Sequence, residues 1–265
     1  MDMIRVQNLS ESLVEDLVSV CTPAPRSGIV EVGVEIKRRW ASRMLGEYGS
    51  IAKVGYLGDR PVAQLLYYPE AADPTGYGRR DVLVVHCIYN PYPEAQGRGI
   101  ARRMVEELLR EAKAWRWCRF IVTHAFETGE HYSQRLFFEK MGFRRVPGGS
   151  PEDLYLPLRG GVLEGGVASA WREGAVHEVF EDDRGRVIAF YTPVCQYGYA
   201  IAHRAAQLVR EVDPHIPVEL VNSWEMPGEY LARGRNWLVV NGVPVRAAPF
   251  NAREFIDEVR RALRL

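Results

Sequence analysis

A glycine-rich loop, Gln96-Gly97-Arg98-Gly99-Ile100-Ala101, directly precedes a stretch with strong helical periodicity. Glycine has no Cβ, so a ligand can approach the backbone closely at Gly97 and Gly99. The N–H groups in the first turn of a helix have no partner within the helix, and the helix dipole adds partial positive charge there. Arg98 and Arg102 add full positive charges. This order of residue types predicts a binding site for phosphate or pyrophosphate.

The surroundings of the loop support this interpretation over a simple glycine turn with solvated arginines. The loop follows an apolar run, Val82–Tyr89, that is typical of a central strand. The helix after it has one apolar face, formed by Ile100, Met104, Val105, Leu108, Leu109 and Ala112. The loop lacks the Lys-Ser/Thr ending of a P-loop and the G-x-G-x-x-G pattern, which disfavours nucleotide hydrolysis and dinucleotide binding.

Composition bounds the remaining classes of function. The 265 residues are enough for two domains, and the 34 basic and 34 acidic side chains cancel. Zero net charge gives no reason to expect nucleic acid or an anionic membrane as a partner. No apolar run approaches the roughly 20 residues of a membrane span, and the amino-terminal residues do not resemble a signal peptide.

The cysteines are scattered through the sequence, at Cys21, Cys87, Cys118 and Cys195. They form neither a C-x-x-C pair nor a zinc-ligand spacing, so we expect no metal. Reduced thiols favour a cytoplasmic location.

Residues 1–158 are predicted to alternate strands and helices in one α/β domain. Ser10 is a plausible N-cap for a first helix that carries Leu13 to Val18. Gly58-Asp59-Arg60 is typical of a hairpin turn. The predicted strands are Ile4–Leu9, Ile51–Leu57, Val62–Tyr68, Val82–Tyr89, Phe120–Thr123, Phe143–Val146 and Leu154–Leu156, and the further helices are Val34–Leu45, the helix after the glycine loop and His131–Met141.

A glycine-rich and then acidic stretch, residues 159–184, is predicted to be a linker that contains the domain boundary. A smaller α/β domain follows at 185–265. Its predicted elements are strands at Val187–Thr192, Val218–Val221 and Trp237–Val240, helices at Gly198–Val212 and Ala252–Leu263, and a turn at Asn241-Gly242.

The loop Gln96–Ala101 resembles the Q/R-x-x-G-x-G/A signature of GNAT-type N-acetyltransferases. The resemblance extends over residues 1–158, including the order of elements and the closing segment Phe137–Val146. It implies a GNAT fold with a central mixed sheet and acetyl-CoA as co-substrate. The implied cofactor-binding residues are the loop residues Gln96, Gly97, Arg98, Gly99, Ile100, Ala101 and Arg102 for the pyrophosphate, and Ile88, Tyr89 and Asn90 for the pantetheine arm.

Acetyl transfer to an amine requires a group that removes the amine proton, a donor for the oxyanion and a proton for the departing thiolate. His86 is the one side chain of near-neutral pKa on the predicted central strand, although a core histidine is the alternative. The position where many relatives have a general-acid tyrosine is Phe138, which has no proton to donate. Tyr132 or His124 could take that role, or the thiolate could leave without a dedicated acid.

Cys195 follows a predicted strand and precedes a helix, a position where the helix dipole can make a thiol reactive. This arrangement resembles a thioredoxin-like domain, and the whole chain is similar to YoaP-like acetyltransferases. Cys195-Gln196-Tyr197-Gly198 lacks a second cysteine, and Arg235-Asn236-Trp237 lacks the expected proline. A cysteine used only for packing therefore remains the alternative.

The sequence thus predicts an acetyl-CoA-dependent N-acetyltransferase for the amine of a small molecule or a peptide. The alternatives are a thiol-redox protein that uses Cys195 and a non-catalytic acyl-CoA-binding regulator. The acceptor amine and the oligomeric state are left open, with a homodimer among the alternatives.

Overall fold

The first of two units in this chain is organised by a single large sheet. The computed structural model describes residues 3–125, 132–168 and 179–264. One unit consists of Met1–Pro25 and Ala41–Ala168, and the other of Arg26–Trp40 and Ser169–Leu265. The sequence did not predict that residues 26–40 belong with the second unit. The boundaries 1–158, 159–184 and 185–265 remain predictions.

The sheet of the first unit has seven strands in the order β1-β2-β3-β4-β5-β7-β6. The central pair, β4 and β5, is parallel, and every other neighbouring pair is antiparallel. The fold class predicted for this unit, α/β with a central mixed sheet, is therefore confirmed. The strands are β1 (Ile4–Asn8), β2 (Ala52–Leu57), β3 (Arg60–Pro69), β4 (Val82–Tyr89), β5 (Phe120–His124), β6 (Arg144–Arg145) and β7 (Asp153–Pro157).

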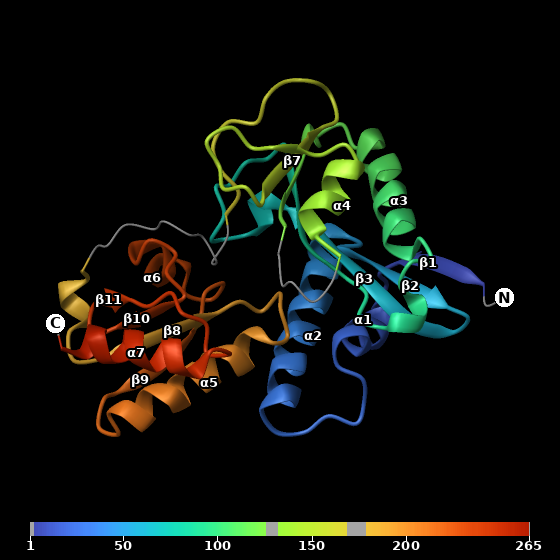
Figure 1. Cartoon of the computed structure of the whole chain (residues 1–265). Helices are drawn as coiled ribbons and strands as arrows, with labels where there is room; N and C mark the ends of the chain where they lie inside the picture. Colours follow the sequence, from blue (N-terminus) through green and yellow to red (C-terminus); the bar gives the residue numbers. More distant parts are fainter. Residues whose placement is uncertain (1–2, 126–131, 169–178, 265) are drawn as a thin grey trace. The chain divides into compact units, whose positions relative to one another are not determined.

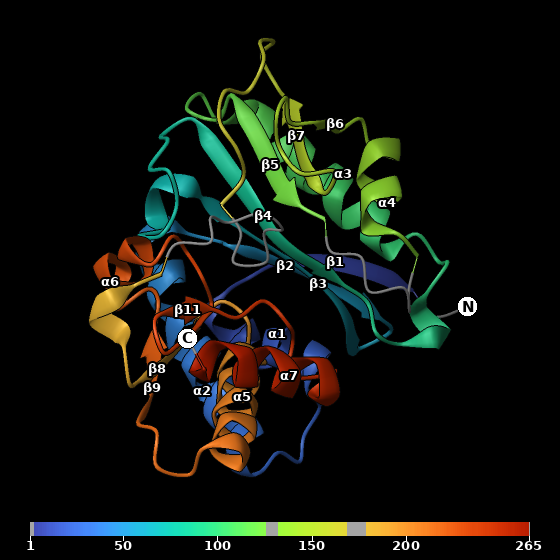
Figure 2. The ribbon, with the colours of Figure 1, turned by 60° about the vertical axis from the view of Figure 1, so that its left-hand side comes forward.

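Helices cover both faces of this sheet, as Figure 2 shows, with α3 and α4 on one side and α1 on the other. Three predicted helix starts were wrong, because α2 begins at Gly28 rather than Val34 and two other helices begin later than predicted. Ser10 precedes a short 3-10 turn and makes no capping hydrogen bond, so α1 begins at Val14. Ser133 caps α4 by accepting a hydrogen bond from the Leu136 N–H at 3.1 Å. The helices are α1 (Val14–Cys21), α2 (Gly28–Tyr48, which runs through both units), α3 (Ile100–Ala114) and α4 (Gln134–Lys140), and Figure 1 labels them.

The strands β4 and β5 pair only over the first half of β4. Their last paired residues are Val85 and Thr123, whereas β4 continues to Tyr89. Figure 2 shows β4 running on past the end of β5. The register of β4 against β3 also shifts here, because Leu66 pairs with Cys87 and Tyr67 with Val85. His86 is therefore the extra residue of a β-bulge, a feature that bends a strand and redirects a side chain.

Helix α3 packs very closely on β2 at Gly55. A Cβ placed on Gly55 would lie 2.5 Å from Ile100 Cγ2 and 3.3 Å from Met104 Sδ. Ile100 and Met104 are both buried in the core between the sheet and α3. Since the first turn of α3 contains Ile100, Gly55 determines how close the start of this helix lies to the sheet.

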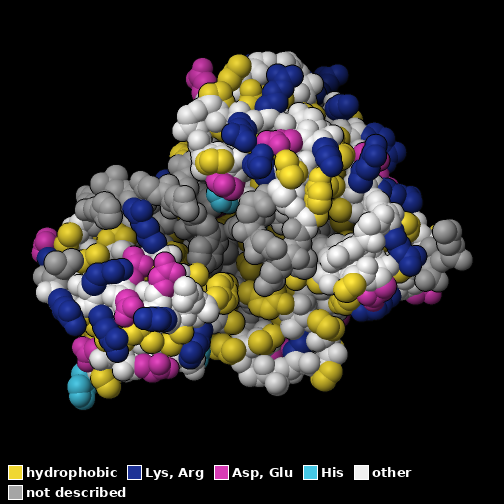
Figure 3. Space-filling model, viewed as in Figure 1, with side chains coloured by type: hydrophobic (Ala, Val, Ile, Leu, Met, Phe, Trp, Pro, Cys, Tyr) yellow, Lys and Arg dark blue, Asp and Glu magenta, His cyan; other side chains and the backbone are white. Residues whose placement is uncertain are grey.

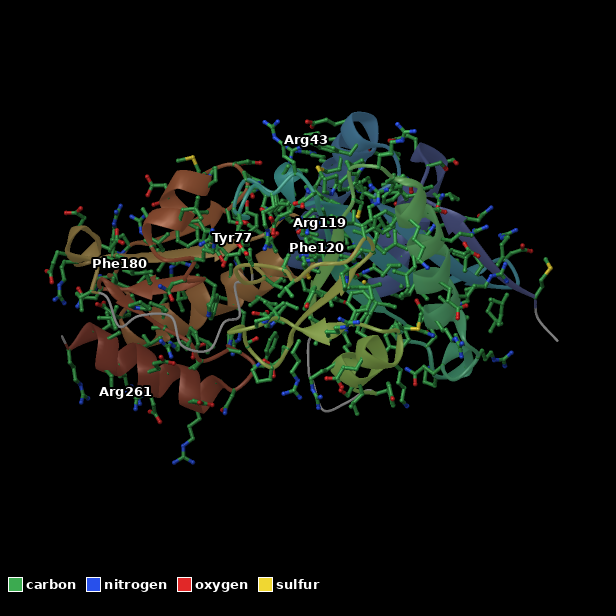
Figure 4. All side chains as sticks on the ribbon, turned by 90° about the horizontal axis from the view of Figure 1, so that it is seen from above. Arg43, Tyr77, Arg119, Phe120, Phe180 and Arg261 are labelled. Carbon is green, nitrogen blue, oxygen red and sulfur yellow. The ribbon has the colours of Figure 1, made fainter. Side chains whose placement is uncertain are left out.

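The opposite face of the sheet is covered partly by the chain after β7. Leu163 and Val167 are buried against Val82, Phe120 and Val122. The Arg119 guanidinium lies 4.9 Å from the centre of the Phe120 ring, a pair labelled in Figure 4. Residues 159–168 were predicted as linker but belong to the first unit. Leu163 and Val167 in this segment pack on the sheet.

The second unit has a four-stranded sheet in the order β11-β10-β8-β9. Strands β8 and β9 are parallel, and β10 is antiparallel to β8. Predicted helices 198–212 and 252–263 are confirmed, while α6 and β11 were not predicted. The elements are β8 (Val187–Tyr191), α5 (Gly198–Val212), β9 (Val218–Asn222), α6 (Pro227–Ala232), β10 (Leu238–Val240), β11 (Val243–Pro244) and α7 (Ala252–Leu263).

The part of α2 within the second unit packs on the loop after β8. A Cβ on Gly33 would lie only 2.1 Å from the carbonyl oxygen of Gln196, so no larger residue fits without a backbone shift. Trp40 also packs edge-on against Trp224, with ring centres 5.7 Å apart. Residues 26–40 thus form part of the core of this unit. None of the described helices is long and apolar enough to cross a membrane.

A buried ion pair joins the start of the second unit to α6. Arg233 Nε lies 2.7 Å from Asp183 Oδ2, and the side chains are 9% and 2% exposed. Desolvation opposes the charge on Asp183, but hydrogen bonds from Arg233 and Arg186 outweigh it, so the pKa of Asp183 is lowered. A lowered pKa in the folded state means that the pair stabilises the fold above the ordinary Asp pKa, and that this stabilisation is lost as pH falls.

We expect Gly55→Ala to destabilise the protein by about 1–3 kcal/mol, because the added methyl group overpacks the contact with Ile100. Denaturant unfolding followed by circular dichroism measures this change. Gly46→Ala is the matched control, since a Cβ at Gly46 meets nothing within 4 Å. It lies in α2, where alanine should stabilise by up to about 1 kcal/mol. Equal effects of both substitutions would contradict the close packing.

We expect Arg233→Met to cost about 3–5 kcal/mol at pH 7, because it leaves the buried Asp183 carboxylate without its main partner. The cost should shrink as pH falls below the ordinary Asp pKa of about 3.9 and through the lowered pKa of Asp183 in the folded state. Unfolding measured between pH 3 and pH 7 tests both points. Arg184→Met is the control, because its partner Glu181 is exposed and the effect should be small at every pH. A pH-independent cost would contradict this account.

Candidate active site

The backbone N–H groups of residues 97–102 are candidates for binding a ligand. None of them donates a hydrogen bond to another described residue. Arg103 is the first residue of α3 whose N–H bonds back along the chain, to the Gly99 carbonyl at 2.9 Å. Together with the positive end of the helix dipole, these N–H groups form a cradle for an anion.

Gly97 and Gly99 make the cradle accessible. Their φ angles are +70° and +79°, in the left-handed region that favours glycine. A Cβ on either residue would meet nothing within 4 Å. The glycines are therefore required for the path of the backbone, and the space beside them is open to a ligand.

The other predicted loop residues divide by role. Ile100 is buried and Ala101 packs against the core, so only their backbone faces the loop. Arg98 and Arg102 are exposed, and Arg102 Nε pairs with Glu106 Oε1 at 2.8 Å. Arg98 is the arginine of the loop whose charge is not committed to an ion pair within the described residues.

A short polar network fixes the path from β4 to the loop. Asn90 Nδ2 donates to the Ala95 carbonyl, and Gln96 Nε2 donates to the Asn90 carbonyl, both at 3.1 Å. The side-chain oxygen of Asn90 is buried and accepts no hydrogen bond from a described residue. Ile88 is buried, and its carbonyl accepts a hydrogen bond from Gln134 of α4 at 3.2 Å. Tyr89 is the last residue of β4 and pairs with Gln64 of β3.

His86 is half-buried at the bulge of β4. Its Nδ1 lies 3.2 Å from the hydroxyl of Tyr68 on β3. Tyr68 pairs with Val84, and residues paired across a ladder share a face of the sheet. The His86 ring therefore lies on the face to which Tyr68 and Val84 point, the face opposite α3.

His124 is the last residue of β5, and its ring is fixed by β7. Its Nδ1 lies 2.8 Å from Asp153 Oδ1, and the Asp153 side chain is completely buried. The Ser150 N–H donates to the other carboxylate oxygen of Asp153 at 3.2 Å. Because Val122 pairs with Val84, the alternation along β5 puts His124 on the same face as His86. The structure thus brings both histidines to one face, where β4 and β5 part.

The remaining acid candidates differ in position. Tyr132 is 59% exposed, and the ammonium of Lys140 lies 5.2 Å from the centre of its ring. Phe138 is completely buried and packs edge-on against Phe143, with ring centres 5.0 Å apart. It fills the core and offers no proton. His131, where relatives have an asparagine, lies outside the described residues.

A separate pocket of about 480 Å³ lies at the other end of α3, lined by Glu111, Trp115 and Trp117 among others. It includes Leu83 at the start of β4 rather than residues of the loop or the end of β4. Tyr68 of β3 also lines this pocket, but no residue of the glycine loop does.

Cys195 is half-buried before α5 in the second unit, and its carbonyl accepts a hydrogen bond from the Gly198 N–H at 2.9 Å. None of the cysteines forms a disulfide. The described residues contain no group of three or more His, Cys, Asp or Glu side chains arranged to hold a metal ion. Basic and acidic side chains are interspersed on the visible surface of each unit in Figure 3, as the zero net charge suggests.

Residues 55–145 match the family model described as an acetyltransferase (GNAT) domain. No curated protein matches the chain.

Similar solved structures include an N-acetyltransferase from Staphylococcus aureus Mu50, with 14% identity, a TM-score of 0.43, and coverage of 59% of this chain and 99% of that one. A GNAT family acetyltransferase from Brucella melitensis, in complex with acetyl-CoA, has 13% identity, a TM-score of 0.42, and coverage of 63% and 94%. The loading GNATL domain of CurA from Lyngbya majuscula has 12% identity, a TM-score of 0.42, and coverage of 60% and 99%.

The matched segment begins in β2, ends in β6, and includes β4, the glycine loop, α3 and β5. Residues 55–145 of the first unit therefore resemble a GNAT acetyltransferase domain.

Proposed function

We propose that the chain is an acetyl-CoA-dependent N-acetyltransferase that acts on the amine of a small molecule or a peptide. The observation that carries the proposal is the row of N–H groups at residues 97–102, which bond to no described residue and lie beside open space. They would bind the pyrophosphate of coenzyme A, with Arg98 adding charge. The match to the GNAT domain covers this loop.

The acyl group would lie where β4 and β5 part. There β5 no longer pairs with β4, and the pantetheine arm would bind along the end of β4 near Tyr89 and Asn90. A backbone N–H near Tyr89 would stabilise the oxyanion. The acceptor nitrogen forms a bond to the carbonyl carbon, and the carbon–sulfur bond then breaks.

The two histidines suit the proton transfers of this reaction. His86 would accept the proton that the amine loses, and His124 would give a proton to the leaving thiolate. Asp153 Oδ1, which lies 2.8 Å from His124 Nδ1, would hold the ring in position for this step. Tyr132 is the alternative donor, but it is largely exposed and nothing in the described chain orients its hydroxyl.

We expect Gly99→Glu to reduce acetyl-CoA binding below detection in calorimetry. The new side chain would occupy the open space at the loop and place a negative charge beside the pyrophosphate. Gly49→Glu is the matched control, because Gly49 has a φ of +75° and equally open surroundings. Its neighbours Tyr48 and Ser50 line the pocket at the far end of α3. Unchanged affinity in a folded Gly99→Glu protein would remove the basis of the proposal.

The second unit bears on the second candidate function, a thiol-redox role for Cys195. Its strand order and its alternation β8-α5-β9-α6-β10-β11-α7 agree with the thioredoxin-like domain suggested by the sequence. Cys195 lies between β8 and α5, where a redox-active cysteine of such a domain would lie. This position keeps a thiol-redox role as the second candidate function.

We expect Cys195 to be a packing residue rather than a redox centre. It is half-buried between the buried residues Val194 and Gln196. Iodoacetamide at pH 7 should therefore modify it more slowly than glutathione, as peptide mass spectrometry can measure, and Cys195→Ala should retain acetyl transfer. Cys118 is the slow reference for alkylation, because burial raises the pKa of its thiol to about 12. Modification of Cys195 faster than glutathione would favour the redox function.

A further inference from the structure

A buried tyrosine connects His86 to a carboxylate on the loop after β3. Tyr68 is 2% exposed, and its hydroxyl lies 3.2 Å from His86 Nδ1 and 3.4 Å from Asp73 Oδ2. The Tyr68 and His86 rings are 6.0 Å apart between centres, at an angle of 34°. Burial raises the pKa of Tyr68 well above its ordinary value, so the phenol keeps its proton. Both of these neighbours can accept that proton in a hydrogen bond.

Burial raises the pKa of Asp73, while hydrogen bonds from Thr75 oppose this shift and hold the side chain as an acceptor. Its Oδ1 accepts from the Thr75 N–H at 2.8 Å and from the Thr75 hydroxyl at 2.7 Å. The same loop is anchored by Glu70, which is 1% exposed and accepts from Arg79 Nε at 2.6 Å. Arg79 also donates to the carbonyl of Gly166 at 3.0 Å, in the segment that covers the sheet.

The chemistry of the three groups sets the direction of the hydrogen bonds. A carboxylate is a stronger acceptor than a neutral imidazole nitrogen, because a bond to an ionised group is roughly twice as strong as a neutral one. Tyr68 therefore donates to Asp73, and its oxygen is left to accept from His86. An imidazole that donates through Nδ1 carries its one proton there and has its lone pair on Nε2.

We propose that Tyr68 and Asp73 are positioning residues that keep neutral His86 in the tautomer with its proton on Nδ1. This inference rests on the proposed function for its role in catalysis, because His86 would then present Nε2 as the base for the acceptor amine. The bulge at His86 gives the ring this orientation, since it redirects the side chain toward Tyr68.

The tautomer can be observed directly by NMR in protein labelled with 15N-histidine, where long-range correlations distinguish a protonated ring nitrogen from one with a lone pair. His86→Gln identifies the signal. We expect a protonated Nδ1 in the native chain, and a shift of the proton to Nε2 in Tyr68→Phe and partly in Asp73→Asn. A proton on Nε2 in the native chain, or no change in Tyr68→Phe, would overturn the proposal.

Tyr67→Phe is the matched control. Tyr67 is the adjacent buried tyrosine on β3, but it points to the other face of the sheet, where it packs against Trp115. It should leave the His86 tautomer unchanged, and melting curves should show that both variants fold.

Steady-state kinetics add a second readout. With an amine that the native chain acetylates as substrate, Tyr68→Phe should lower kcat roughly tenfold, a part of the 10²–10⁴ that a general base contributes. The KM for acetyl-CoA should stay unchanged, because the loop is not altered. A change in KM alone would count against positioning. If the native chain transfers no acetyl group, the proposed function fails, while the NMR measurement still decides the tautomer.

Discussion

The candidate site depends on the row of N–H groups at residues 97–102, which donate no hydrogen bond to any residue that the structure describes. These groups can face a ligand only if the chain turns sharply at residues 97–99 and α3 begins directly after this turn. The left-handed glycines Gly97 and Gly99 permit the turn, and the Asn90–Gln96 hydrogen bonds hold its entrance. Gly55 lets Ile100 approach the sheet, which fixes the first turn of α3. The sheet, the helix and the loop thus act together to leave the positive end of α3 open.

The parting of β4 and β5 matters for the same reason. A parallel pair that continued to Tyr89 would use its backbone groups within the sheet. Because pairing ends at Val85 and Thr123, β5 makes no ladder hydrogen bonds to the last residues of β4. His86 and His124 lie on one face of the sheet at this point. His86 Nδ1 is close to the Tyr68 hydroxyl on β3, and His124 Nδ1 is close to Asp153 on β7. In the proposed reaction, His86 would act on the acceptor amine and His124 on the leaving thiolate.

The second unit is built from segments far apart in the sequence. Residues 26–40 lie in α2, and the rest begins after residue 168. The close approach of Gly33 to the Gln196 carbonyl packs that helix on the loop that carries Cys195. A thioredoxin-like unit that carries out redox exchange needs access to its thiol, so a helix packed on this loop favours a structural or binding role for Cys195.

The sequence by itself determined the loop, the central strand and α3, because glycine conformation and helical periodicity are local properties. Strand β4 and helices α5 and α7 were predicted to the residue for this reason. The tertiary structure alone decided which side chains meet. Asp153 reaches His124 through the register of β7 on β5, and Tyr68 reaches His86 because of a bulge. Neither contact has a signature in the sequence, since both depend on how distant strands align.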